Sequence, residues 1–336
     1  MTRMLSLALG GLLAGLALAS PARAQAITLK FSQFLGPKSF FQLDVLEPWA
    51  KEIEARTGGK VTVETYDGTT PLGGVADQAS NVKSGKVDIA LGLRGAEGAK
   101  FPGSSLIELP FLVPDAGRGS KALWGLYRDG TLAAEYADYK VLALFVHNLG
   151  LVHTKERPVR LPGDMKGLRL RSPNNTVSEA LTTLGAQPLV LQVNDVMPAF
   201  DAGRLDGIVT NWGNPLPRFN DYVKHHTELM FYTSAFFIVM NKERYEGLPQ
   251  DVRAAIDATT GEAWVAKFGD YWNKWDAPVR DGVNAPGHDV IVPTAAEMAA
   301  WRDALGSVTE KYVSSLETGA FPGARPALEK LSAALR

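Results

Sequence analysis

The sequence has 336 residues, of which 46% are hydrophobic and 21% are charged, which is enough apolar material for two domains of ordinary size. This composition excludes a disordered chain. The net charge of −1 excludes the basic surface that a nucleic-acid-binding protein needs. The chain has no cysteine, so disulfides, thiolate zinc sites, iron–sulfur clusters and thiol nucleophiles are excluded as well.

Residues 1–24 are predicted to be a secretory signal peptide. Arg3 precedes the apolar run Met4–Ala19, and Ala22-Arg23-Ala24 is an Ala-x-Ala cleavage site. The run is about 15 residues long, shorter than the roughly 20 of a transmembrane helix, so a membrane anchor is the weaker alternative. We therefore expect cleavage after Ala24 and a periplasmic protein that begins at Gln25.

Strand and helix patterns alternate from the start of this mature chain. Strands are predicted at Ile27–Phe31, Val61–Tyr66 and Val87–Leu91. The intervening helices end at Thr57-Gly58-Gly59 and near Ser84-Gly85, where glycine is typical of a C-cap. The same logic predicts later strands at Val141–Val146, Gly167–Arg171, Pro188–Leu191 and Gly207–Thr210. The alternation predicts an α/β fold.

Two domains are expected to be interleaved, because no Pro/Gly/Ser-rich linker divides the chain. Residues 25–148 with 236–276 are predicted to form domain I, and residues 149–235 with 277–336 domain II, both α/β.

A long helix is predicted to span both domains. Pro249 is well placed as its first residue, and no further proline occurs before Pro278. A helix of about 27 residues extends roughly 40 Å, more than the width of one small domain. Gly261 and Gly269 are the positions at which such a helix could break.

Motifs of enzymes and cofactors are missing. The five histidines, His147, His153, His225, His226 and His288, lack the spacing of a helical zinc site. The adjacent His225 and His226 are predicted to lie in a solvated loop, whereas His147 and His153 are either structural or ligand-contacting. No Gly-x-Ser-x-Gly nucleophile elbow or nucleotide-binding glycine pattern occurs. We therefore predict no catalysis, no cofactor and no metal.

Arg171 is the main candidate for ligand binding. It ends a predicted strand that is followed by Pro173, and side chains at the carboxyl ends of strands in open α/β folds point into the crevice where ligands bind. A guanidinium can grip a carboxylate by two charge-assisted hydrogen bonds. Arg169 shares its face of the strand, so a solvated face is the alternative interpretation.

Six segments, in this order, resemble the extracytoplasmic solute-binding proteins of TRAP transporters, the DctP family. They are Glu47–Ala50 with Thr57–Val61, Gly85–Ala90, Glu108–Leu112, Met165–Arg171, Gly185–Pro188 and Ala202–Gly207. The resemblance implies a periplasmic-binding-protein-like fold with two α/β domains, joined by crossing strands and a long helix, that close over an organic acid.

The resemblance also implies a set of pocket residues. The carboxylate-gripping arginine of the family falls on Arg171 and its nearby asparagine on Asn174. Thr210, Asn211 and Trp212 stand where many relatives have a Glu-Asn pair, so the pocket is expected to be more apolar. Members that bind sialic acid have a second arginine where this chain has Leu151, which makes sialic acid a poor candidate.

Other residues are candidates for further ligand contacts. Arg94 follows a predicted strand and is either a second ionic contact or a surface charge. Trp212 is expected to face the pocket. The remaining aromatic candidates, which are either an aromatic wall or core residues, are Phe34, Phe40, Phe236 and Phe237.

The predicted function is capture of a small carboxylate-bearing acid by hinge closure, followed by delivery to sodium-coupled TRAP membrane subunits. The ligand is expected to be hydrophobic or aromatic, or a keto or hydroxy acid, because the pocket is apolar around one anchored carboxylate. Contact with the inner membrane is peripheral, through the permease. The alternatives are an ABC-type binding protein, a periplasmic sensor or a periplasmic hydrolase.

Overall fold

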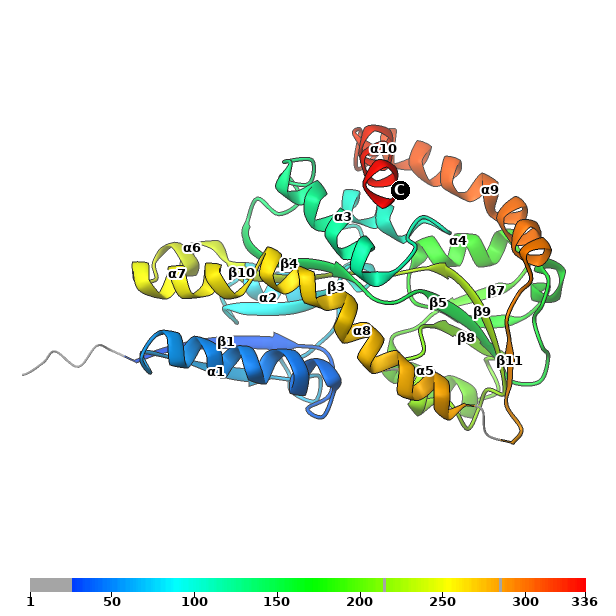
Figure 1. The fold of residues 1–336 in the computed structure, drawn as a ribbon, viewed down its shortest axis with the longest axis horizontal. Coiled ribbons are helices and arrows are strands. Elements are labelled where there is room, and N and C mark those ends of the chain that lie inside the picture. Colours follow the sequence, from blue (N-terminus) through cyan, green and yellow to red (C-terminus); the bar gives the residue numbers. More distant parts are fainter. Residues whose placement is uncertain (1–25, 214–215, 284–285) are drawn as a thin grey trace, which may run out of the picture.

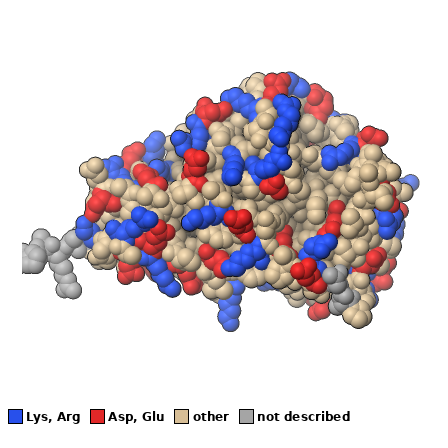
Figure 2. All heavy atoms as spheres, viewed as in Figure 1, with Lys and Arg blue, Asp and Glu red and all other residues tan. Residues whose placement is uncertain are grey.

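The computed structural model describes residues 26–213, 216–283 and 286–336, so the predicted signal peptide and its cleavage site lie outside the described residues. Two β-sheets lie side by side, each covered by helices (Figure 1). Among the described residues, no helix is both long and apolar enough to cross a membrane. Basic and acidic side chains are interspersed on the face shown in Figure 2, as expected for a chain with a net charge near zero.

The first sheet has the strand order β2-β1-β3-β10-β4. Its strands are β1 (Ile27–Gln33), β2 (Val61–Tyr66), β3 (Ile89–Leu93), β4 (Tyr139–Val146) and β10 (Ala235–Asn241). β1 pairs in parallel with β2 and β3, whereas β10 is antiparallel to both β3 and β4. The carboxyl ends of β1, β3 and β4 therefore lie at one edge. We call this sheet and the helices packed on it the first lobe.

The second sheet has the strand order β11-β9-β5-β8-β6-β7. Its strands are β5 (Gly150–Thr154), β6 (Arg169–Ser172), β7 (Gln187–Val190), β8 (Gly207–Thr210), β9 (His225–Tyr232) and β11 (Asp289–Ile291). β5 is antiparallel to β8 and β9, and β6 is parallel to β8, so β6, β8 and β9 end at the same edge. We call this sheet with its helices the second lobe.

Two strand-to-strand crossings join the lobes. β4 leads into β5 through residues 147–149, and β9 leads into β10 through residues 233–234. The two crossings are bonded to each other: the backbone N–H of Ser234 donates to His147 Nε2 at 3.1 Å, and the hydroxyl of Thr233 donates to the His147 carbonyl at 2.6 Å. These interleaved crossings confirm the predicted two-domain α/β fold.

A helical region after Pro249 spans both lobes. It consists of α7 (Gln250–Thr259) and α8 (Glu262–Gly282), which crosses from the first lobe to the second (Figure 1). Gly261 breaks the region because it adopts a φ of 64°, a conformation that glycine accepts without strain. Gly269 does not break α8; its missing side chain instead lets α8 approach Gly117 closely.

The remaining helices cover the two sheets. They are α1 (Glu47–Arg56), α2 (Gln78–Lys83), α3 (Ala116–Arg128), α4 (Asn175–Thr183), α5 (Val193–Asp201), α6 (Lys242–Glu246), α9 (Ala295–Glu317) and α10 (Ala324–Leu335). Short 3-10 or π-helical turns occupy Gln42–Leu46, Arg94–Ala96, Gly103–Glu108, Pro162–Met165 and Leu216–Arg218. α9 packs on α4 and α10 on α3, so the C-terminal helices return from the second lobe to the first (Figure 1).

The second sheet is buried on both faces. Alternate residues of its strands enter two separate cores: Leu170 and Val209 face one core, whereas Leu151 and Ile208 face the other. This alternation follows from the two-residue period of a strand. The alternation matters for the site because Arg171 of β6 pairs with Ile208 of β8, and paired residues lie on the same face of a sheet.

Candidate functional site

The carboxyl edges of the two sheets face a shared cleft. A cavity of about 440 Å³ lies there, lined from the first lobe by the loop at Phe34–Ser39 and from the second lobe by Gln192–Asn194. Lys38 and Arg218 also line it, and no lining residue is acidic. A ligand crevice outside the carboxyl ends of strands is the usual arrangement in open α/β folds. The cleft is therefore suited to a small anion.

Arg171 is the next-to-last residue of β6, at this edge of the sheet, and is 5% exposed; it lies outside the set of residues that line the 440 Å³ cavity. Its Nε donates to the Leu191 carbonyl at 2.9 Å, and one terminal nitrogen donates to the Val209 carbonyl at 3.3 Å. No carboxylate of the described residues pairs with it, and the second terminal nitrogen, Nη2, has no described hydrogen-bond partner. Burial lowers the pKa of Arg171. A buried cation without a counter-ion is costly, so the geometry favours an incoming anion.

Asn174 follows Arg171 at the start of α4. Its Oδ1 caps the helix by accepting from the Val177 backbone N–H at 2.9 Å, whereas its Nδ2 is buried without a partner. The N-terminus of a helix also favours negative charge. A Cβ atom at Gly95 of the first lobe would lie 2.7 Å from Asn174 Cβ, so this end of α4 contacts the opposite lobe. Asn174 thus lies at the junction of the lobes.

Arg94 has a different role from either one that the sequence suggested. It is 6% exposed, so it is not a surface charge. Its Nε and Nη2 donate to the two carboxylate oxygens of Glu108 at 3.1 and 2.5 Å, and Glu108 also accepts from the Ala235 backbone N–H at 3.0 Å. The charge of Arg94 is therefore neutralised within the first lobe, and the pair holds the start of β10.

His147 lies in the crossing between β4 and β5. Burial, together with the nearby charge of Arg171, lowers its pKa to about 4 even though the Asn148 carbonyl bonds its Nδ1. Its Nε2 accepts from Ser234, so both ring nitrogens are occupied. His147 is neutral at pH 7 and offers a ligand only the surface of its ring.

Thr210 is the last residue of β8, and Asn211 and Trp212 follow it; none of these three predicted pocket residues lines the 440 Å³ cavity. Asn211 Nδ2 donates to Asp276 Oδ1 of α8 at 2.9 Å, which ties the second sheet to the bridging helix. Trp212 instead belongs to the core beneath the sheet, where its ring packs 5.3 Å from that of His153 and its Nε1 has no described partner.

A chain of three histidines lies behind Thr210 and corrects the prediction that His225 and His226 lie in a loop. Both belong to β9, and His226 is fully buried. Its Nδ1 lies 2.8 Å from Nδ1 of His153, and its Nε2 lies 3.0 Å from Nδ1 of His288. Burial lowers the pKa of His153 to about 3 and that of His226 to about 4, so both are neutral. The two histidines at the start of β9 concealed this strand.

Two predicted aromatic residues lie together at the edge of the first sheet. Phe34 stacks on Phe236 with ring centroids 6.3 Å apart, and Phe236 stacks on Phe145 at 5.2 Å. His147 and Trp272 of α8 pack on the same Phe236 ring at 6.0 Å each. Phe34 is the ring of this cluster that lines the cavity, and Phe236 packs behind it; we call Phe34 and Phe236 the aromatic wall.

Three other predicted site residues lie elsewhere. Phe237, next to Phe236 in a strand, points to the opposite face and is fully buried against Gly92. Leu151 is fully buried in the core under the second sheet. Phe40 is 36% exposed and stacks on Trp275, outside the residues that line the cleft. The sequence could not distinguish these positions because neighbouring strand residues alternate between faces.

The sequence analysis missed two polar residues close to these groups. Asp276 of α8 is buried with neutral partners, and burial raises its pKa to about 6 despite hydrogen bonds from Asn148 and Asn211. Tyr232 ends β9 at the same edge as Arg171, and its ring packs 5.6 Å from that of His147. Its position at the end of a strand was the signal that could have identified it.

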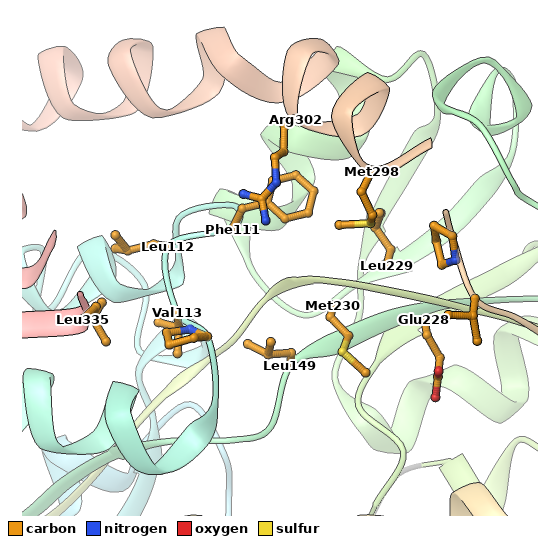
Figure 3. Close-up of a pocket in the computed structure, with 13 residues that line it drawn as sticks. Phe111, Leu112, Val113, Leu149, Glu228, Leu229, Met230, Met298, Arg302 and Leu335 are labelled. Carbon is orange, nitrogen blue, oxygen red and sulfur yellow. The ribbon is translucent and has the colours of Figure 1, made fainter. Parts of the chain in front are cut away.

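A second cavity, of about 410 Å³, lies beneath α9 (Figure 3). Its lining is largely apolar, including Met230 and Met298. The Arg302 guanidinium stacks over the Phe111 ring at 4.8 Å, and Glu228 pairs with an arginine of α8 at 2.6 Å. The lining of this cavity includes the acidic Glu228, whereas the lining of the cleft has no acidic residue, so this cavity fits a small anion less well than the cleft does.

Comparison with known proteins identifies the family. The model of the bacterial extracellular solute-binding proteins of family 7, DctP, matches residues 31–315. The chain belongs to this family. DctP proteins are non-enzymatic periplasmic solute-binding proteins of TRAP transporters, which removes the ABC-type and hydrolase alternatives.

Relatives of known ligand cover almost the whole chain. The 2,3-diketo-L-gulonate-binding periplasmic protein YiaO of Escherichia coli K12 is 26% identical, over 92% of this chain and 94% of its own. A TRAP solute-binding protein from Rhodoferax ferrireducens T118, solved with copurified benzoate, is 28% identical with a TM-score of 0.87, over 92% of this chain and 98% of its own.

A second solved structure comes from a marine metagenome and is described as specific for aromatic acid ligands. It contains co-crystallised 3-hydroxybenzoate and is 28% identical with a TM-score of 0.87, over 93% of this chain and 98% of its own. Both solved proteins therefore hold a carboxylate attached to an aromatic ring.

Proposed function

We propose that this DctP-family protein captures a small aromatic carboxylic acid and delivers it to the membrane subunits of a TRAP transporter. The observation that carries the proposal is the buried guanidinium of Arg171, for which the described residues provide no carboxylate partner and no hydrogen-bond partner for Nη2. The ligand carboxylate supplies the missing counter-ion. Asn174, at the N-terminus of α4, contributes a buried Nδ2 donor to the same anion.

The ring of the acid packs on the aromatic wall. Phe34 and Phe236 stack at the cleft, and their faces match a flat apolar ligand. The two solved relatives with aromatic acids support this class. A short keto or hydroxy acid fills the carboxylate end of the site but leaves the wall uncovered.

Delivery depends on closure of the lobes over the ligand. The proposed domains are residues 25–148 with 236–276 and residues 149–235 with 277–336, so that the crossings at 147–149 and 233–234 form the hinge. A ligand that bridges both lobes stabilises the closed state by its differential affinity for that state. We further propose that residues 1–24 direct export and are cleaved after Ala24, which places the protein in the periplasm beside its permease.

A thermal-shift screen of Gln25–Arg336 tests the proposal. The panel contains benzoate, 3-hydroxybenzoate, succinate, glucuronate and several amino acids. At a ligand concentration of about 100 times Kd, binding stabilises the protein by about 2.7 kcal/mol and raises Tm by about 5 °C. We expect this shift with the aromatic acids, and its absence with every acid contradicts the proposal.

Two variants make the screen specific for the site. Arg171→Ala should remove the shift, because truncating one partner of a buried charge pair costs about 2 to 5 kcal/mol. Arg169→Ala is the matched control: it lies two residues away on the same strand but pairs with Asp206 at 2.6 Å on the surface. An equal loss in both variants would contradict the role of Arg171.

A further inference from the structure

The cavity beneath α9, which we call the back cavity, is lined by residues of both lobes (Figure 3). On one side lie Val113 and Leu335, which belong to the core of the first lobe. On the other side lie Leu229 and Met298, which pack in a core of the second lobe. Leu149, in the first of the two crossings, also lines it. Rotation of one lobe against the other therefore changes the width of this cavity.

The back cavity and the ligand cleft lie at opposite ends of the two sheets. The cleft is lined by loops that follow β2 and β7, each at one end of its strand order. The back cavity is lined at the other ends, by Val292 after β11 and by Val113 before α3, which packs on β4. In Figure 1, α9 and α5, whose first residues line the cleft, lie on opposite edges of the molecule, and the crossing strands run between them.

This arrangement couples the two spaces through the hinge. Two bodies that turn about a hinge between two gaps widen one gap as they narrow the other. With the crossings at 147–149 and 233–234 as the hinge, opening of the ligand cleft narrows the back cavity. Its lining is apolar apart from Glu228, which pairs with Arg280 at 2.6 Å, and Arg302, which stacks on Phe111. The lobes can therefore approach each other there without burying an unpaired polar group.

The loop that borders the back cavity passes from one core to the other. Leu109 and Val113 are buried in the core of the first lobe, whereas Phe111 between them packs on a core of the second lobe. The Phe111 N–H donates to the Phe231 carbonyl of β9 at 2.7 Å. Phe111 and Met230, which both line the cavity, have φ values of 58° and 48°, which are uncommon for residues other than glycine. Strained residues of this kind cluster at switch regions, and here they lie where the two lobes meet.

We propose that the back cavity is the space that the lobes occupy when the ligand cleft opens, so that a side chain filling it holds the cleft closed and raises the affinity for the ligand. The inference rests on the proposed function, because the crossings must act as the hinge. A ligand that needs the closed state has an apparent Kd that rises as the closed fraction of the free protein falls. Filling the cavity disfavours the open state and so increases that fraction.

The test fills the back cavity in the mature protein. Met298→Trp places a larger side chain in the lining from α9, and Val292→Trp does so from a position that is 60% exposed. Met197→Trp of α5 is the matched control, because Met197 is 40% exposed and lines neither cavity. By calorimetry with benzoate, we expect a Kd about tenfold lower in both cavity variants and unchanged in the control. By X-ray scattering without ligand, the radius of gyration of the cavity variants should match that of the benzoate-bound wild type.

The outcomes separate this inference from the proposed function. If the cavity variants bind benzoate as the wild type does, or more weakly, the role of the back cavity is overturned while the proposed function stands. An equal gain in the control overturns that role too, because the substitution then acts without the cavity. Val292→Trp decides the matter if Met298→Trp does not fold.

Scattering decides the role of the back cavity if the wild type binds no benzoate. That result contradicts the proposed ligand class, but the open and closed shapes of the free protein are still measurable. A smaller radius of gyration in the cavity variants, and not in the control, then supports the inference. A radius equal to that of the wild type overturns it.

Discussion

Arg94 and Arg171 occupy similar places in the two lobes but face opposite electrostatic situations. Each stands at the carboxyl end of a strand, and they are 6% and 5% exposed. Arg94 meets both oxygens of Glu108, whereas Arg171 meets only backbone carbonyls. The same residue at the same kind of position is thus structural where the fold supplies a carboxylate, and available to a ligand where it does not.

Asp276 shows a third way to bury a charge. Its partners are neutral amides and a backbone N–H, so no cation compensates its carboxylate, and burial raises its pKa to about 6. A buried arginine cannot become neutral by a change in protonation as a carboxylate can, because arginine stays protonated at any pH a protein experiences. We therefore expect the free energy of unfolding to respond differently to mutation at Arg94, Arg171 and Asp276.

The largest effect on stability is expected at Arg94. Arg94→Met leaves the fully buried Glu108 without its counter-ion, which typically costs about 3 to 5 kcal/mol. Urea unfolding of the ligand-free protein measures the change. Adding Glu108→Gln to that variant should recover most of the loss, and a single variant within 1 kcal/mol of wild type would contradict the structural role.

The opposite sign is expected at Arg171. Arg171→Met removes a buried cation that has no counter-ion, so the ligand-free protein should gain about 1 to 3 kcal/mol in its free energy of unfolding. The same variant should no longer be stabilised by aromatic acids. A loss as large as that of Arg94→Met, measured in the same urea experiment, would show that the two arginines do not differ as described.

At Asp276 an effect no larger than that at Arg171, and present only at high pH, is expected. Its raised folded-state pKa means that the folded protein holds a proton between pH 3.8 and about 6, and the stability linked to that proton is lost as the pH rises through about 6. Asp276→Asn should therefore stabilise the protein at pH 8 by about 1 to 3 kcal/mol and leave it nearly unchanged at pH 4. Thermal unfolding at both pH values measures this, and an equal effect at both would exclude titration of Asp276.

Local signals in the sequence predicted much of the fold. The strands at Val61–Tyr66 and Gly207–Thr210 have the predicted bounds, because apolar β-formers are bounded there by glycine and turn residues. The first helix ends at Arg56 with Thr57 as its C-cap, and the following Gly58 and Gly59 have positive φ. Gly261 and Gly269 show the limit of these signals, because the sequence marks both as possible helix breaks. Gly269 lies inside α8, and its close packing on Gly117 of α3 is visible only in the structure.

The candidate site was harder to predict because its roles depend on partners. The sequence places Arg94 and Arg171 alike at strand ends, and only the fold brings Glu108 to the first of them. Phe236 and Phe237 are adjacent, and which of them packs on Phe34 depends on the register of β10 with its neighbours. Tyr232 was missed because the strand that carries it begins with two histidines, which were interpreted as a loop.

A crystal structure of the mature protein with benzoate tests the central claim, that Arg171 holds the carboxylate of the ligand, most directly. The account predicts a carboxylate oxygen about 2.7 to 2.9 Å from Arg171 Nη2, with the ring of the acid against Phe34 and Phe236. A benzoate bound instead by Lys38 or Arg218 at the mouth of the cleft, or in the cavity of Figure 3, with Arg171 bonded only to its two carbonyls, would contradict it.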